Sequence, residues 1–196
     1  MGILGFYFRK LWIVFKNEVL VLPSRIVVFL FFWVLLLLPF FTQDPYLLRI
    51  LILTSIFAIF AASWDLLSGF TGQMNFGHAL FFGVGAYTAG LLNLHAHLPP
   101  WGSIPLGALG AVLAGLIIGI PCLRLKGTYL ALTTLAFPII LMGIVFAIPD
   151  ITGGELGITG LERLARSRVT NYYITVVLML VLCAIMWKIT DSNTGI

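Results

Sequence analysis

Charged residues are scarce in this chain, and that scarcity excludes a soluble domain. Asp, Glu, Lys and Arg make up 9% of the 196 residues and hydrophobic residues make up 61%, whereas soluble proteins carry roughly 25% charged residues. A soluble fold cannot hide so much apolar surface, so the composition indicates an integral membrane protein. The net charge of +4 comes from 11 Lys and Arg against 7 acids. That balance is typical of cytoplasmic loops near lipid headgroups rather than of nucleic-acid binding.

Motifs for nucleotide binding, metal binding and catalysis are also missing. The sequence has no G-x-x-x-x-G-K-[ST] loop, so we expect this chain not to bind ATP itself in the usual way. Cys122 and Cys183 lie apart in apolar segments and are interpreted as reduced packing residues. His95 and His97 stand in a turn and are too few for a metal site. With no Ser-His-Asp or Cys-His arrangement evident, the sequence predicts neither an enzyme nor a cofactor-binding protein.

Apolar segments are what the chain has in abundance. They predict an all-α, polytopic membrane helical bundle with about six transmembrane segments. The segments are residues 26–41, 50–67, 79–94, 104–121, 128–148 and 172–189. The distribution of Lys and Arg favours an orientation with both termini inside, N-in and C-in. Residues 1–22 mix basic and aromatic side chains, which predicts an N-terminal interfacial segment or an aromatic tail before a membrane domain at 23–196.

Small residues recur at helical spacing on two of these segments. The fourth segment carries the stripe Gly107, Ala111, Gly115 and Gly119. The third carries the stripe Ala79, Gly83, Ala86 and Gly90. Because small side chains let helix backbones approach closely, we expect both helices to pack tightly, on each other or on a partner subunit. In the fifth segment Pro138 cannot donate to the Thr134 carbonyl, which predicts a kink.

The stretch from Asp65 to Leu92 interrupts the apolar pattern. It gathers backbone breakers and hydrogen-bonding side chains between two apolar segments: Gly69, Gly72 and Gly77, with Thr71, Gln73, Asn75 and His78. In a membrane, irregular backbone is tolerated only where it is buried in protein or lines a wet cavity. Glycine-interrupted apolar segments point to transport sites. We therefore predict a substrate pathway at this break, formed by Gln73, Asn75, His78, Thr71 and Asp65. A short interfacial turn is the alternative.

Two features of the sequence, the ionisable residues at the break and the segment 150–170, each allow two interpretations. Asp65 and His78 are ionisable near membrane depth and are functional candidates for that reason, but Asp65 also fits a residue that reaches interfacial water. Residues 150–170 combine glycines with charges and predict an outer loop. Such a loop suits the docking of a substrate-carrying protein, and it equally suits a solvated connection between helices.

Three stretches, in order along the chain, resemble one protein family. They are GFTGQMNFGHALFFGVGAYTAGLL at 69–92, GTYLALTTLAF at 127–137 and ITGGELGITG at 151–160. Together they resemble the permeases of branched-chain amino acid ABC importers, the LivM-type subunits. The rest of the chain is apolar sequence of a kind common to many membrane proteins.

The resemblance implies a translocation subunit in a cell inner membrane, with residues 23–196 as part of a transmembrane permease domain. The implied partners are a second permease subunit, two cytoplasmic ATPase subunits that bind the ATP, and a periplasmic or lipid-anchored amino-acid-binding protein. The implied cargo is a branched-chain or related amino acid. A urea or sugar permease of the same superfamily, a channel or ion-coupled carrier, and a non-transporting assembly subunit are the alternatives.

The chain departs from the family pattern at three places. The family usually has a Gly-Glu pair where this chain has Pro138 and Ile139, so no role of that glutamate is expected here. It more often has Asn at the position of Asp65. Its ATPase-coupling segment usually begins near where residues 192–196 end this sequence, so we expect a fragment, a truncated gene product or coupling through another chain.

Overall fold

The computed structural model describes residues 23–42, 44–70, 72–122 and 124–191, and every regular element among them is helical. The α-helices are α2 (Pro23–Phe41), α3 (Pro45–Asp65), α4 (His78–His95), α5 (Pro100–Cys122), α6 (Thr128–Ala147), α7 (Pro149–Thr152) and α8 (Arg168–Thr190). A π-helical turn, η2 (Leu66–Phe70), follows α3, and a 3-10 turn, η3 (Gly154–Leu156), follows α7. The prediction of an all-α fold is confirmed. The interfacial segment predicted for residues 1–22 lies outside the described residues.

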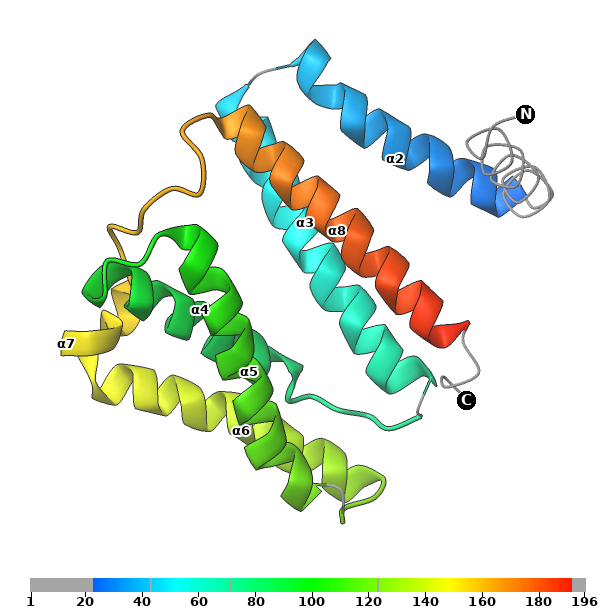
Figure 1. Ribbon diagram of the computed structural model, residues 1–196. Coiled ribbons are helices and arrows are strands. Elements are labelled where there is room, and N and C mark those ends of the chain that lie inside the picture. Colours follow the sequence, from blue (N-terminus) through cyan, green and yellow to red (C-terminus); the bar gives the residue numbers. More distant parts are fainter. Residues whose placement is uncertain (1–22, 43, 71, 123, 192–196) are drawn as a thin grey trace, which may run out of the picture.

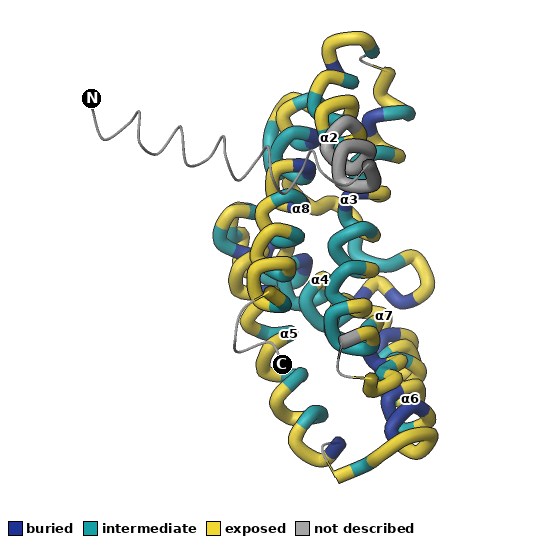
Figure 2. Tube along the Cα trace, turned by 90° about the vertical axis from the view of Figure 1, so that its right-hand side faces the viewer, coloured by how far each residue is buried: buried dark blue, intermediate teal, exposed yellow. Residues whose placement is uncertain are grey.

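All six predicted apolar segments are helices. Among the described residues, four helices are long and apolar enough to cross a membrane: α3 with its following turn (Pro45–Gly69), α5, α6 and α8. The finer prediction of about six spans stays a prediction for α2 and α4. Many large apolar side chains are exposed on every long helix, and buried positions form only short stretches along the chain (Figure 2). That distribution suits a chain whose outer faces contact lipid instead of water.

Local sequence chemistry sets several helix ends. Asp44 accepts a hydrogen bond from the Tyr46 backbone N–H at 3.0 Å, and Pro45 occupies the first position of α3. α8 begins earlier than predicted, at Arg168, so its first turn includes residues expected in the outer loop. α7 and η3 also lie within that loop region. α6 continues unbroken through Pro138, and the kink there stays a prediction.

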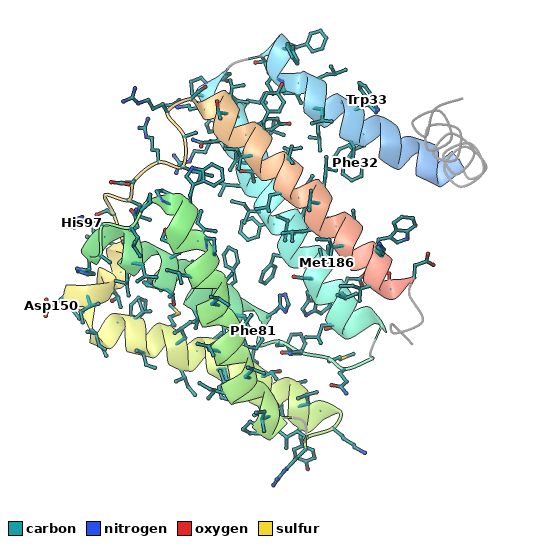
Figure 3. The ribbon with its side chains drawn as sticks, in the orientation of Figure 1. Phe32, Trp33, Phe81, His97, Asp150 and Met186 are labelled. Atoms are coloured by element: carbon teal, nitrogen blue, oxygen red, sulfur yellow. The ribbon has the colours of Figure 1, made fainter. Side chains whose placement is uncertain are left out.

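The helices form two groups, which lie apart in Figure 1. In the first, α3 and α8 run side by side and bury Leu48, Tyr172, Val176 and Met179 between them. α2 joins this group because the Tyr172 hydroxyl donates to the Leu35 carbonyl, while Phe32 lies between α2 and α8 (Figure 3). The second group consists of α4, α5 and α6, with α7 at one end. The stretch 66–77 connects the two groups.

Small residues hold α4 against α5, but along a different line of α4 from the one predicted. A methyl group on Gly107 would come within 2.5 Å of the Gly85 carbonyl oxygen and 2.8 Å of the Ala89 Cβ. Ala111 faces Gly85 in the same contact, whereas Gly115 is looser and Gly119 has open space beside it.

α4 and α5 pack tightly on each other, as one of the two predicted arrangements has it, but Gly83 and Gly90 of the predicted α4 stripe do not face α5. Gly83 faces Leu141 of α6, and Gly90 faces Ile158 in the loop that precedes α8. α4 carries small residues on more than one face, and its neighbours on each side use a different set. The α5-facing set includes Gly85 and Ala89.

Candidate functional site

The break between α3 and α4 is built from one turn with widened helical geometry and one extended segment. After the π-helical turn η2, the backbone reaches Gly72 with φ 66°, a left-handed conformation that favours glycine. Gly77 does not need such freedom, since its φ is −78°. Gly77 is required for space instead: a Cβ there would lie 3.1 Å from both the Asn75 Oδ1 and the Thr134 carbonyl oxygen. That carbonyl is the one that Pro138, lacking an N–H, leaves without its helical donor.

Hydrogen bonds tie the extended segment to helices on both sides. The Trp64 indole N–H of α3 donates to the Asn75 carbonyl at 2.8 Å. The Asn75 side-chain oxygen accepts from the Gly77 N–H at 2.7 Å, and the Phe76 N–H donates to the Thr134 hydroxyl oxygen at 3.1 Å. Asn75, which the sequence singled out, therefore fixes the backbone at this break together with Trp64 and Thr134, because these side chains satisfy groups that no helix satisfies.

His78 points from the start of α4 toward α3. Its Nε2 lies 2.7 Å from the Ser63 hydroxyl oxygen, and Ser63 in turn donates to the Phe60 carbonyl at 2.8 Å. The direction of the bond between Ser63 and His78 depends on the tautomer of the His78 ring. The ring also stands edge-on to Phe60, with centroids 5.1 Å apart, and its Nδ1 is buried without a hydrogen-bond partner. His78 thus belongs to the contact between the two helix groups.

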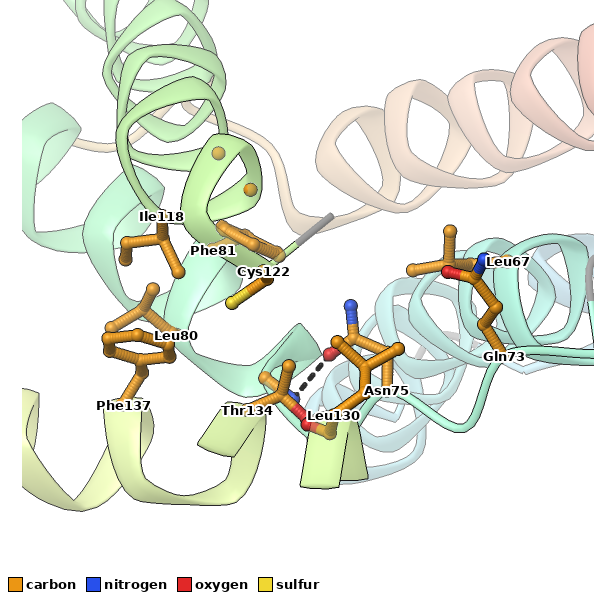
Figure 4. A pocket seen from close by; sticks show the side chains of 13 residues that line it. Leu67, Gln73, Asn75, Leu80, Phe81, Ile118, Cys122, Leu130, Thr134 and Phe137 are labelled. Atoms are coloured by element: carbon orange, nitrogen blue, oxygen red, sulfur yellow. Dashed lines mark hydrogen bonds between the residues drawn. The ribbon is translucent and has the colours of Figure 1, made fainter. Parts of the chain in front are cut away.

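A cavity of about 300 Å³ lies beside the extended segment (Figure 4). Its walls come from the break itself, the start of α4, the end of α5 and the start of α6. Three polar residues line it, Gln73, Asn75 and Thr134, and the remaining walls are apolar or glycine: Leu67, Gly77, Leu80, Phe81, Gly115, Ile118, Gly119, Cys122, Leu130 and Phe137. No ionisable Asp, Glu, Lys, Arg or His side chain is part of this lining.

A second cavity, of about 590 Å³, is lined by Gly72, Gln73, Met74 and Phe76 of the same segment. It runs along the start of α6 and the α5–α6 turn, including Lys126, Gly127 and Thr128. Gln73 and Leu130 line both cavities and so stand between them. Gln73 is exposed, and among the described residues its amide has no hydrogen-bond partner.

The structure brings together only part of the predicted pathway set. Gln73 and Asn75 line the first cavity, whereas His78 and Asp65 do not. Asp65 is exposed, and its carboxylate packs beside Gly69, where a Cβ would lie 2.7 Å from its Oδ1. Thr71 lies outside the described residues.

Sequence reasoning missed three residues of this site. Trp64 and Thr134 bind the backbone of the break, and Cys122, interpreted as a packing residue, lines the cavity. The only sequence signal for Thr134 was its place four residues before Pro138. Among the described residues no group of three metal-ligating side chains exists.

Comparison with known proteins adds the following findings. The sequence model of a family described as the branched-chain amino acid transport system, permease component, matches residues 46–196. The chain is 37% identical, over 111 residues, to the high-affinity branched-chain amino acid transport system permease protein LivM of Escherichia coli (strain K12), and 36% identical over 111 residues to that of Salmonella typhimurium. Each match covers 57% of this chain and 26% of the relative, so the matched region spans about a quarter of these relatives. No solved structure matches.

Proposed function

The chain belongs to the branched-chain amino acid transport permease family, and on that premise we propose that it is a translocation subunit of an ABC importer for branched-chain or related amino acids. The observation that carries the proposal is the cavity at the break between α3 and α4. This cavity combines an uncharged, mostly apolar wall with the Gln73 and Asn75 amides and the Thr134 hydroxyl.

The cavity suits a small solute with one apolar and one polar end. Its volume of about 300 Å³ lies at the lower end of the range of about 300–1,000 Å³ for ligand pockets. An aliphatic side chain would lie against residues such as Leu80, Ile118 and Phe137. The polar end would face the Gln73 amide, which has donors and an acceptor to offer.

Gln73 marks the route that we propose between the two cavities. The second cavity leads toward the α5–α6 turn with Lys126. In the N-in orientation this turn faces the cytoplasm, because α2 and α4 then run outward and α3 and α5 run inward. Substrate would pass Gln73 and Leu130 on its way to that side.

The proposal also includes the rest of the transporter and its membrane. The chain would sit in the inner membrane as a multi-pass subunit with about six spans, paired with a second permease subunit. Two cytoplasmic ATPase subunits would bind and hydrolyse ATP, and a periplasmic or lipid-anchored binding protein would deliver the amino acid. The LivM-type relatives support this arrangement.

Leucine uptake by Gln73→Leu in the complete transporter tests the proposal, with uptake normalised to the amount of assembled complex. Because the Gln73 amide bonds to no described residue, its loss should leave folding intact. Losing one hydrogen bond to the substrate should lower uptake about three- to tenfold. Asn75 requires a change that keeps its side-chain oxygen, since that oxygen accepts the Gly77 N–H. Asn75→Asp keeps that acceptor, but it replaces the amide donor with a carboxylate and adds a negative charge to the uncharged lining, so uptake should fall further than in Gln73→Leu.

Thr54→Val is the matched control. This exposed threonine of α3 bonds only to its own helix, from Oγ1 to the Ile50 carbonyl at 2.9 Å, so uptake should not change. Full uptake by Gln73→Leu and Asn75→Asp would return this stretch to an interfacial turn.

A further inference from the structure

Four arginines converge on one pocket at the opposite end of α3 from the break. Arg49 comes from the second turn of α3, Arg163 and Arg166 from the segment before α8, and Arg168 from the first turn of α8. The pocket has a volume of about 530 Å³. All four side chains are exposed, so they can turn toward a ligand that enters.

The four arginines form no ion pair with another described residue, and none of the four guanidinium groups forms a hydrogen bond with one. Asp44 is engaged as the cap of α3, accepting the Tyr46 N–H. The acids of the same segment, Asp150, Glu155 and Glu162, do not line the pocket. Four like charges in one pocket repel each other, and an anion that binds there relieves that repulsion.

The walls of the pocket indicate its depth in the membrane. They include the first two turns of α3, with Pro45, Tyr46 and Ile52, and the first turn of α8. α3 and α8 are both candidate membrane spans, so their first turns lie where each helix enters the hydrocarbon. Tyr46, 73% exposed, has the amphipathic character that favours the headgroup level.

The arginine-bearing segment is held in place from α8. The Asn171 side-chain N–H donates to the Ala165 carbonyl at 3.1 Å. Ala165 lies between Arg163 and Arg166 in the chain, so this bond fixes the backbone from which both side chains extend. The pocket is therefore formed by a positioned segment rather than by a free loop.

We propose that this pocket binds the phosphodiester headgroup of an anionic phospholipid. Guanidinium groups match phosphate oxygens in pairs of hydrogen bonds, and the apolar wall of α3 below them accommodates the start of an acyl chain. Those two features together fit a lipid better than an acidic protein surface, which has no acyl chain to place there. Bound lipid also compensates for positive charge on the face that is outer in the N-in orientation.

Titration of the purified full chain with phosphatidylglycerol, followed by native mass spectrometry, tests the proposal. The variant is the double change Arg163→Gln and Arg166→Gln, which removes two exposed charges. Its affinity for phosphatidylglycerol should fall about thirtyfold, as expected for two basic side chains near an anionic surface. The control is the double change Arg124→Gln and Lys188→Gln, which removes two exposed charges elsewhere and should leave affinity unchanged.

Further measurements distinguish phosphatidylglycerol from free phosphate and from a docked protein as the ligand of this pocket. Inorganic phosphate should fail to displace phosphatidylglycerol, because it has nothing to place against the α3 wall. Displacement at equal phosphate-group concentration would overturn the lipid assignment in favour of free phosphate. Equal affinity of both double variants would show that the lipid binds without this pocket. Loss of binding-protein capture in Arg163→Gln/Arg166→Gln, with phosphatidylglycerol affinity intact, would overturn the proposal in favour of a protein-docking surface.

Discussion

The two helix groups are held together by opposite means. α3 and α8 meet through bulky side chains, with Tyr172 completely buried between them. α4 and α5 meet through glycine and alanine, so that Gly107 lies directly against the backbone of Gly85. Both solutions are available in a membrane, where association depends on close packing and hydrogen bonds rather than on the removal of apolar surface from water.

The difference between the two helix groups explains why the cavity lies in the group of α4, α5 and α6. The α3–α8 pair is a packed pair of helices, and the hydroxyls of Tyr172 and Tyr173 bond only to backbone carbonyls of α2, those of Leu35 and Leu36. The cavity lies in the other group, where α4, α5 and α6 surround a short irregular segment. Close backbone contact at Gly107 leaves space toward Gly115 and Gly119, and both line the cavity. The small-residue stripe of α5 is thus packed against α4 at Gly107 and borders the cavity at Gly115 and Gly119.

The largest expected effect on stability comes from removing a bulky side chain from the contact between α3 and α8. Tyr172→Ala leaves a cavity where the side chain was fully buried, and should cost about 3–5 kcal/mol, as large aromatic-to-alanine changes do in cores. Thermal unfolding in detergent measures this. Tyr129→Ala is the control, because Tyr129 is exposed on α6. Equal loss of stability in both variants would mean that α3 and α8 do not depend on this side chain.

The reciprocal change adds bulk to the α4–α5 contact. Gly107→Ala places a methyl group against backbone atoms that cannot yield without moving a helix, and should cost about 1–3 kcal/mol by overpacking. Gly119→Ala adds the same methyl group where nothing lies within 4 Å. Folded yield and unfolding temperature should fall for the first variant only. A matching fall for Gly119→Ala would place the tight contact at the other end of the stripe.

The smallest expected effect on stability comes from the hydrogen bond between Trp64 of α3 and Asn75 of the connecting segment. Trp64→Phe keeps most of the ring and removes the N–H that donates to the Asn75 carbonyl. Its loss should cost about 0.5–1.5 kcal/mol, the usual net contribution of one hydrogen bond. Trp101→Phe, on an exposed residue, should cost nothing measurable in the same unfolding assay. If the two changes are equally mild, the groups are coupled by other contacts, such as the ring of Phe60 against His78.

The sequence was sufficient to predict every long helix. Apolar runs bounded by Pro, Gly and charged residues predicted all six, since hydrophobic length and helix breakers are local properties. It also identified the break from Asp65 to His78, because glycines and amides are conspicuous in apolar surroundings. Gln73 and Asn75 in particular line the cavity that the break helps to form.

The remaining details depend on tertiary contacts. Small residues occupy more than one face of α4, and only the positions of α5 and α6 determine that Gly85 and Ala89 face α5. His78 was predicted to lie on the substrate pathway, whereas its ring bonds to Ser63, fifteen residues earlier. Thr134 meets Phe76 across 58 residues of sequence. No local pattern contains such information.

The most direct test of the account is the alkylation rate of Cys122 in the complete transporter, with and without leucine. The chain has two cysteines: Cys122 lines the cavity, and Cys183 packs against the α3–α8 core and serves as an internal control. A small membrane-permeant maleimide labels both, and mass spectrometry resolves the two peptides. We predict that leucine slows the labelling of Cys122 and leaves that of Cys183 unchanged, while aspartate protects neither. Equal Cys122 labelling with and without leucine, in a transporter that takes leucine up, would contradict the placement of this cavity on the substrate route.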